Sequence, residues 1–213
     1  MKIVTHDPSY TAWGICIIDE DRKKISLNEL SCQINKHQPS SIMLATIQLP
    51  EDVYHYVDHT LISKLDVRVG LELATTYGQQ FQAELYAIDA AIYRLMSHYT
   101  SDISLYSTTY INWLKGKGYK PTIGKKEDTI FLVEKALRIF TTHGYSLIVE
   151  KFEDTICDIN KVKNKYPRIK TITSGEADAT MLALRIYVRN NDDEITKELL
   201  ELIPRLGESK ELE

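Results

Sequence analysis

The sequence predicts a single α/β domain in which helices flank a mixed β-sheet. Three features predict it: short apolar segments near the N-terminus, alternating helical and strand-like segments after residue 50, and a strongly amphipathic stretch near residue 90. A chain of 213 residues is long enough for one domain with its own core. We expect residues 1–190 to form this domain and the acidic residues 191–213 to form a helical, partly flexible tail.

Five segments are predicted to be strands. Residues 2–7 end at Pro8, which cannot donate a hydrogen bond to a strand ladder, and residues 12–19 and 25–34 follow as an antiparallel meander. In VRVGLELA (67–74) apolar residues alternate with Arg68, Gly70 and Glu72, as in a strand with one apolar face. A short fifth strand is predicted over residues 103–106.

Four helices are predicted around these strands. They cover residues 51–64, about 81–95, about 126–141, and a segment that begins at Ser174. The second has the clearest pattern, an apolar stripe of Phe81, Leu85, Ile88, Ile92 and Leu95. In the last, Ser174 is a suitable N-cap and Glu176 lies in the first turn, where the helix dipole favours a carboxylate. Between them, SLIVEKF (146–152) is compatible with a strand.

Composition excludes several classes of protein. Cys16, Cys32 and Cys157 are widely spaced and form no CxxC pair, so we expect neither a zinc site nor a disulfide framework, and a reducing cytoplasm fits best. No stretch approaches the roughly 18 apolar residues of a membrane span.

The charge distribution is more informative than the net charge of −4, which by itself disfavours a nucleic-acid partner. Residues 111–126 contain five lysines and no acid, and residues 161–170 contain four lysines and Arg168 and no acid. Two basic stretches on an acidic body indicate a localised anion-binding surface, although such runs are as often simply solvated.

Four acidic residues are candidates for catalysis. Asp7 ends the first strand, Glu72 lies near the end of the fourth between the small residues Gly70 and Ala74, and Glu176 and Asp178 lie in the first turns of the final helix. If strands one and four are parallel neighbours, Asp7 and Glu72 emerge at one edge of the sheet, where open α/β sheets bind ligands.

Clustered carboxylates repel one another, and a divalent cation relieves the repulsion. Oxygen ligands favour Mg²⁺, or Mn²⁺, over zinc. Two such ions roughly 3.5–4 Å apart can activate a water and stabilise the leaving oxygen of a phosphodiester. The sequence therefore indicates a site for two Mg²⁺ ions on Asp7, Glu72, Asp178 and Glu176, and no organic cofactor.

Structural interpretations of the same residues stay open. Asp7 could be only a turn residue before Pro8, Arg68 could pair with Glu72, and Glu176 and Asp178 could merely complement the helix dipole. The neighbouring aromatic residues could stack on unpaired bases but are more often core residues, and His6 is expected to be structural. These aromatics are Tyr10, Trp13, Tyr77, Tyr110 and Trp113.

Three segments resemble the RuvC family of Holliday-junction resolvases. HDPSYTAWGICIID is similar to the family's first strand and turn, VGLELATTYGQQ to the strand with its metal-binding Glu, and SGEADATMLALRIY to its last helix. They occur in the family's order and the resemblance spans about residues 1–190.

The resemblance implies a ribonuclease H-like fold, with a sheet of three antiparallel and then two parallel strands. It also implies a homodimer that cleaves branched DNA, the four-way junction above all, with Mg²⁺. Asp7, Glu72 and Asp178 match the first, second and last catalytic acids, but Gly175 stands where the family has a further ligand, which Glu176 could replace. The lysine-rich segment resembles the family's DNA-backbone contacts, at Lys115, Lys117, Lys120, Lys125 and Lys126.

The longer segment 144–173 departs from the family pattern and is similar to bacteriophage versions, for which the host bacterial cytoplasm is expected. One rival is an actin-like or sugar-kinase enzyme, but nine glycines with no paired phosphate loop disfavour it. Others are a non-catalytic nucleic-acid-binding module of the same fold, and a nuclease for flaps, forks or RNA–DNA hybrids.

Overall fold

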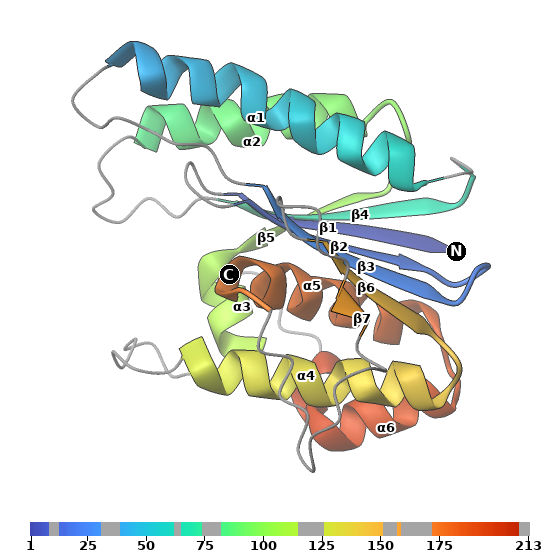
Figure 1. The fold of residues 1–213 in the computed structure, drawn as a ribbon. Coiled ribbons are helices and arrows are strands. Elements are labelled where there is room, and N and C mark those ends of the chain that lie inside the picture. The colour runs from blue at the N-terminus through green and yellow to red at the C-terminus, as the bar shows by residue number, and fades with distance from the viewer. Residues whose placement is uncertain are drawn as a thin grey trace.

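A central β-sheet separates two layers of helices (Figure 1). This arrangement comes from a computed structural model, which describes residues 1–8, 13–30, 39–61, 65–73, 82–114, 126–150, 157–158 and 172–208. The strands are β1 Lys2–Asp7, β2 Trp13–Asp19, β3 Lys24–Leu30, β4 Val67–Leu73, β5 Ile103–Ser107, β6 Ser146–Glu150 and β7 Cys157–Asp158. The helices are α1 Pro39–Thr60, α2 Gln82–Met96, α3 Thr108–Leu114, α4 Lys126–Thr142, α5 Ser174–Asn190 and α6 Glu194–Leu202, followed by a 3₁₀ turn at Pro204–Leu206.

The sheet has the strand order β5-β4-β1-β2-β3-β6-β7. β1, β2 and β3 form an antiparallel meander, whereas β4 pairs parallel to β1 and β5 parallel to β4. This confirms the predicted core of three antiparallel and two parallel strands. Two strands extend it, since β6 pairs parallel to β3 and β7 antiparallel to β6.

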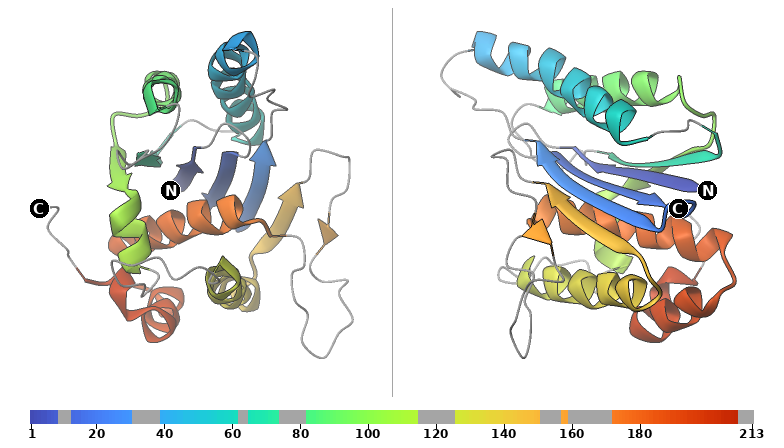
Figure 2. Two further views of the ribbon diagram at one scale, coloured as in Figure 1. Left: turned by 90° about the vertical axis from the view of Figure 1, so that its left-hand side faces the viewer. Right: turned by 45° about the vertical axis from the view of Figure 1, so that its right-hand side comes forward.

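Each face of the sheet has its own apolar core because side chains alternate along a strand. Val4, Ile15 and Val69 pack against α1 and α2, and Ile3, Cys16 and Leu27 pack toward α5. Figure 2 shows α5 against the sheet, with α4 and α6 farther out on the same side. The two faces can therefore carry different chemistry at the same strand ends.

The structure differs from the sequence-based expectations in four helical features. The helix predicted over residues 51–64 begins at Pro39 and includes Pro50, and α3 was not predicted. The N-cap of α5 is Thr173 and not Ser174. The C-terminal segment is helical, as expected, but it is not loosely held over residues 194–206, because Leu199 and Leu206 are fully buried beside α4 and α5.

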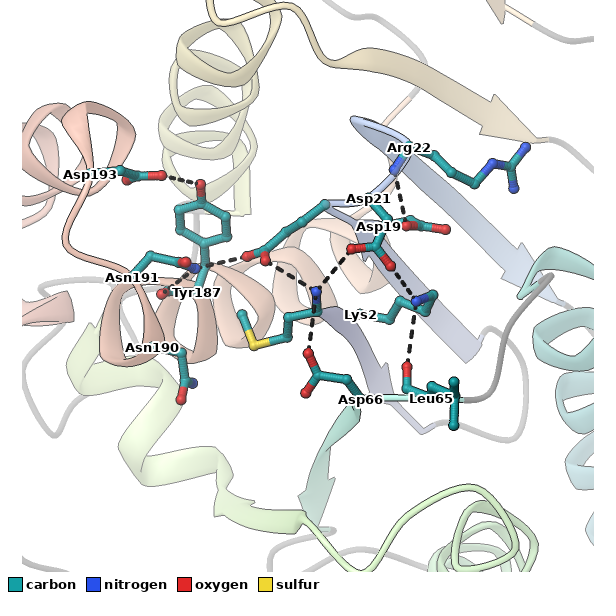
Figure 3. Close-up of polar contacts among 12 residues, drawn as sticks. Lys2, Asp19, Asp21, Arg22, Leu65, Asp66, Tyr187, Asn190, Asn191 and Asp193 are labelled. Atoms are coloured by element: carbon teal, nitrogen blue, oxygen red, sulfur yellow. Dashed lines mark hydrogen bonds and ion pairs between the residues drawn. The ribbon is translucent and has the colours of Figure 1, made fainter.

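The end of the sheet where β1 begins is closed by paired charges (Figure 3). The amino group of Met1 lies 3.3–3.4 Å from the carboxylates of Glu20, Asp21 and Asp66. Lys2 Nζ donates to Asp21 and to the backbone carbonyl of Leu65. These contacts tie the β2–β3 turn and the start of β4 to β1.

Within the residues that the structure describes, none of the helices combines the length and the apolarity that a bilayer crossing requires.

Candidate metal centre

Asp7 and Glu72 end adjacent parallel strands at the same level. β1 and β4 pair residue by residue from Lys2 with Val67 to His6 with Leu71. The next step of this register sets Asp7 beside Glu72. Neighbouring strands lie about 4.8 Å apart, so the two residues start close enough to share an ion between their side chains.

Both side chains belong to the face of the sheet that α5 covers. Along β1, Ile3 packs in the α5-side core and Thr5 donates from Oγ1 to the carbonyl of Ala179 in α5, at 2.6 Å. Asp7 follows on the same face by alternation. Glu72 continues the face of Gly70, which contacts Ile186 of α5. Asp7 is half-buried and Glu72 is 8% exposed.

The first turn of α5 rests directly on β2 at Gly14. A Cβ atom at Gly14 would lie 2.1 Å from the backbone carbon and oxygen of Gly175, so no other residue fits there. Gly14 is the antiparallel partner of Asp7. Because Gly14 has no side chain, the start of α5 can pack close to the sheet beside Asp7.

Farther along, α5 keeps the same contact with the sheet through a stripe of residues at helical spacing. Gly175, Ala179 and Ile186 contact Gly14, Thr5 and Gly70 respectively. The space above Gly70 is therefore filled by Ile186. Gly70 therefore serves helix–sheet packing and leaves no space for an ion on its own side of Glu72.

Asp178 and Glu176 flank this stripe on opposite sides. Two positions along an α-helix differ by about 200° around its axis, so the two side chains cannot both face the same strand end. Asp178 is half-buried and lies one turn after Gly175, on the same side of α5.

Glu176 has a structural role in the cap of α5. Its Oε2 accepts a hydrogen bond from the Thr173 backbone N–H at 2.7 Å, and its own N–H donates to Thr173 Oγ1 at 3.1 Å. This reciprocal pair is a capping box, and Glu176 is 1% exposed. Its geometry favours the helix-capping interpretation over a role as metal ligand.

The acids do not form a ready-made metal site in the part of the chain that the structure describes. No three His, Cys, Asp or Glu side chains among those residues converge closely enough to hold an ion. Instead the fold sets Asp7 and Glu72 level on one face, with Asp178 on the helix above them. A bound cation would offset the repulsion between these carboxylates.

Most of the predicted basic loop lies outside the described residues. Lys115, Lys117, Lys120 and Lys125 lie outside the described residues, and Lys126 is placed only as the first residue of α4. The N-terminal end of α4 lies on the same side of the molecule as the ends of β1 and β4 (Figure 1).

Sequence reasoning missed one acid at this site, Glu29 near the end of β3. Gly14 pairs with Asp7 on one side and with Glu29 on the other, so the three residues form one row across the sheet. Ile25 and Leu27 pack toward α5, and Glu29 follows them on that face. The signal was present in ISLNEL, where an acid ends an apolar face.

On the opposite face of the same strand ends, the described residues include a packed pair of rings. His6 and Trp13 are fully buried, with ring centroids 6.1 Å apart in an edge-on contact. Burial lowers the pKa of His6 to about 3, so its ring is neutral.

Arg68, which could have paired with Glu72, has its Nη1 3.3 Å from Asp102.

Two of the other aromatics also pack within the protein. Tyr110 is 6% exposed, and Trp113 packs against it with ring centroids 5.5 Å apart. Tyr10 and Tyr77 lie outside the described residues.

A divalent cation fits the chemistry of this site. Every acidic side chain at the strand ends and on the inner side of α5 offers oxygen, the donor that Mg²⁺ and Mn²⁺ prefer. Asp7, Glu72 and Asp178 would hold the ion, and it would supply the charge that these carboxylates need in order to approach one another.

The molecule is thus an α/β domain with a mixed sheet and with acidic residues at one edge of it. No protein-family model matches the sequence, and no curated protein matches it significantly. Among solved structures, the chain is similar to Thermus thermophilus RuvC in complex with Holliday junction substrate, at 15% identity over 97% of both chains with a TM-score of 0.49. A second Thermus thermophilus RuvC structure matches at 15% identity over 94% of this chain and 95% of that one, with a TM-score of 0.47.

The manganese-soaked human cytomegalovirus terminase nuclease domain is also similar, at 16% identity over 92% of this chain and 85% of that one, with a TM-score of 0.47. At such identities the similarity concerns the fold alone. The predicted mixed α/β sheet flanked by helices is confirmed by the strand order.

Proposed function

We propose that this protein is a metal-dependent endonuclease that cleaves branched DNA, with the Holliday junction as its substrate. The observation that carries the proposal is the alignment of Asp7 and Glu72 on adjacent parallel strands, on the face where α5 carries Asp178. Two-metal hydrolysis of a phosphodiester uses carboxylates from separate parts of a chain, and this alignment of Asp7 with Glu72 supports such a site.

In this proposal Asp7, Glu72 and Asp178 bind two Mg²⁺ or Mn²⁺ ions. Bound ions supply Lewis-acid activation of water and charge stabilisation at the leaving oxygen. The chain holds the helix that carries Asp178 against the strands, because Gly14 and Thr5 fix α5 against β2 and β1. The buried His6 and Trp13 close the other face, so the substrate approaches from the α5 side.

The basic segment after α3 is proposed to contact the DNA backbone through Lys115, Lys117, Lys120, Lys125 and Lys126. The sequence resemblance supports it, and so does the N-terminal end of α4, which lies on the same side of the molecule as the ends of β1 and β4 (Figure 1). A symmetric junction has two equivalent strands to cut, so the proposal includes a homodimer acting in the bacterial cytoplasm.

The test is cleavage of labelled four-way junction, fork, flap, duplex and RNA–DNA hybrid substrates with Mg²⁺, Mn²⁺ or chelator. We expect symmetric nicks near the junction centre with metal only, and Asp7→Asn should abolish them while junction binding persists. Cleavage by Asp7→Asn would contradict the catalytic assignment. Binding without cleavage in either metal would instead indicate the non-catalytic module.

A further inference from the structure

A polar pocket lies where β4 and β5 begin, at the opposite end of β4 from Glu72. It has a volume of about 190 Å³, and its lining includes Arg68 of β4, Arg189 near the end of α5, Asp102 and Ser104. Arg68 precedes Glu72 by four residues, so the pocket lies about 13 Å along the strand from the aligned acids. It is therefore separate from the candidate metal centre.

The packing of α5 on the sheet brings the two arginines to one pocket. Arg68 and Gly70 share the face of β4 that α5 covers, and Ile186 of α5 rests on Gly70. Arg189 follows Ile186 by three residues, so it lies one turn farther along the same side of the helix. Since α5 runs toward the start of β4, this turn is level with Arg68, and both side chains line the pocket.

The charges of the pocket leave one guanidinium without a counterion. Arg68 Nη1 lies 3.3 Å from Asp102 Oδ2, but Arg68 Nε is buried and forms no hydrogen bond with any residue that the structure describes. Arg189 is exposed and forms no ion pair with a carboxylate in the described part of the chain. Two guanidinium groups and one carboxylate give the pocket a net positive charge.

A simpler role for Arg189 is to offset the dipole at the end of α5, because it lies in the last turn of that helix. However, Asn190 Nδ2 already donates to the carbonyl of Ile186. Asn191 donates to the carbonyl of Tyr187 from both its backbone N–H and its Nδ2. The guanidinium of Arg189 is therefore not needed to cap these carbonyls.

We propose that this pocket binds a phosphate group between Arg68 and Arg189. Arginine presents a planar fork of N–H donors that matches the oxygens of phosphate, and such charge-assisted hydrogen bonds are stronger than neutral ones. The Nε of Arg68 is one donor that a phosphate would satisfy, and the Ser104 hydroxyl lines the same pocket. The phosphate could belong to the DNA backbone or to a free phosphate compound, which share this chemistry.

The test is titration of inorganic phosphate into the full chain by calorimetry, with chloride keeping the ionic strength constant. We expect a single saturable site, which Arg189→Gln and Arg68→Gln should each weaken at least about tenfold, because each removes a charged hydrogen-bond donor. Arg189→Lys keeps the charge without the fork and should be intermediate.

Arg94→Gln is the matched control. Arg94 is an exposed arginine in the last turn of α2, as Arg189 is in the last turn of α5, so both variants remove the same charge from the same position in a helix. Arg94→Gln should bind phosphate like wild type. Circular dichroism and thermal melting of each variant separate loss of the ligand from misfolding.

Absence of saturable phosphate binding by the wild type would overturn the proposal. Wild-type affinity in folded Arg189→Gln, or an equal loss in Arg94→Gln, would also overturn it. None of these results bears on the proposed cleavage, because none of the residues that line the pocket is an acid of the candidate metal centre.

Binding of a labelled four-way junction distinguishes the two sources of phosphate. If the pocket takes a phosphate of the DNA backbone, Arg189→Gln should weaken junction binding and reduce the slope of its salt dependence by about one. Unchanged junction binding by a variant that has lost inorganic phosphate would assign the pocket to a free phosphate compound. Both results support a phosphate site.

Discussion

The two faces of the sheet differ sharply at the same strand ends. On the face covered by α1 and α2, His6, Trp13 and Leu71 are buried and pack together without a charge. One residue along each strand, on the α5 face, the row is Asp7, Gly14 and Glu72. Strand alternation therefore places the acids of these strand ends on one face of the sheet. On that face Gly14 lets α5 pack closely, and α5 carries a further acid, Asp178.

The largest expected effects are on cleavage by variants of the α5 face. Glu72→Gln and Asp178→Asn should each reduce junction cleavage more than about 100-fold, because even residues that only orient metal ligands contribute 10–100-fold. Gel assays with Mg²⁺ measure this.

Glu176→Gln is the matched control for these two variants. It can still accept the hydrogen bond from Thr173, so its cleavage rate should stay within about twofold of wild type. A loss comparable to that of Asp178→Asn would return Glu176 to the set of metal ligands.

The next largest effect is expected from adding a side chain at Gly14, the residue against which the start of α5 packs. Gly14→Ala should lower the free energy of unfolding by more than about 2 kcal/mol, because the new methyl meets backbone atoms of Gly175 that cannot turn aside. Chemical denaturation monitored by circular dichroism measures the change.

Gly70→Ala on the same face provides the comparison for Gly14→Ala. Its methyl would meet the tip of Ile186 at 2.8 Å and the Thr5 methyl at 3.0 Å, both on side chains. We expect a loss of about 1 kcal/mol or less. Equal losses at the two glycines would contradict the special role of the Gly14–Gly175 contact.

On the face covered by α1 and α2, burial of His6 should make the free energy of unfolding depend on pH. The folded pKa of His6, about 3, lies below its ordinary value of 6.5, so the unfolded chain binds an extra proton between these values. Its contribution to stability is therefore complete above pH 6.5 and decreases as the pH falls toward 3, by up to about 1.4 kcal/mol per pH unit.

Urea denaturation between pH 4 and 7 tests this, with His6→Leu as the reference variant. The slope attributable to His6 should disappear in the variant. An unchanged slope would show that the buried ring is not the group that titrates.

The smallest expected effect concerns the cap of α5. Thr173→Ala removes the side chain that accepts from the Glu176 N–H and should cost about 1 kcal/mol. Ser174→Ala should have less effect, because Ser174 is the first helical residue and not the cap. Thermal melting of the two variants distinguishes them.

The sequence was sufficient for the features that depend on local patterns. Pro8 after Asp7 and the alternation in VRVGLELA predicted where β1 and β4 end, and hence the alignment of Asp7 with Glu72. The start of α1 was missed because Pro50 lacks a backbone N–H and reads as a helix boundary, yet the helix continues through it.

Features that depend on tertiary contacts could not be predicted from the sequence. Nothing near Gly14 in the sequence indicates that it faces Gly175, and without that contact neither the position of Glu29 nor the packing role of Gly70 can be seen. The N-cap of α5 was misplaced by one residue because Thr173 and Ser174 are both good caps.

The most direct test of the central claim is a crystal structure of the protein grown with Mn²⁺, with ions located by anomalous scattering. We expect an ion in contact with both Asp7 and Glu72 on the α5 face, and a second ion near Asp178. Ions bound elsewhere in a protein that cleaves junctions, with Asp7 and Glu72 contacting none, would contradict it.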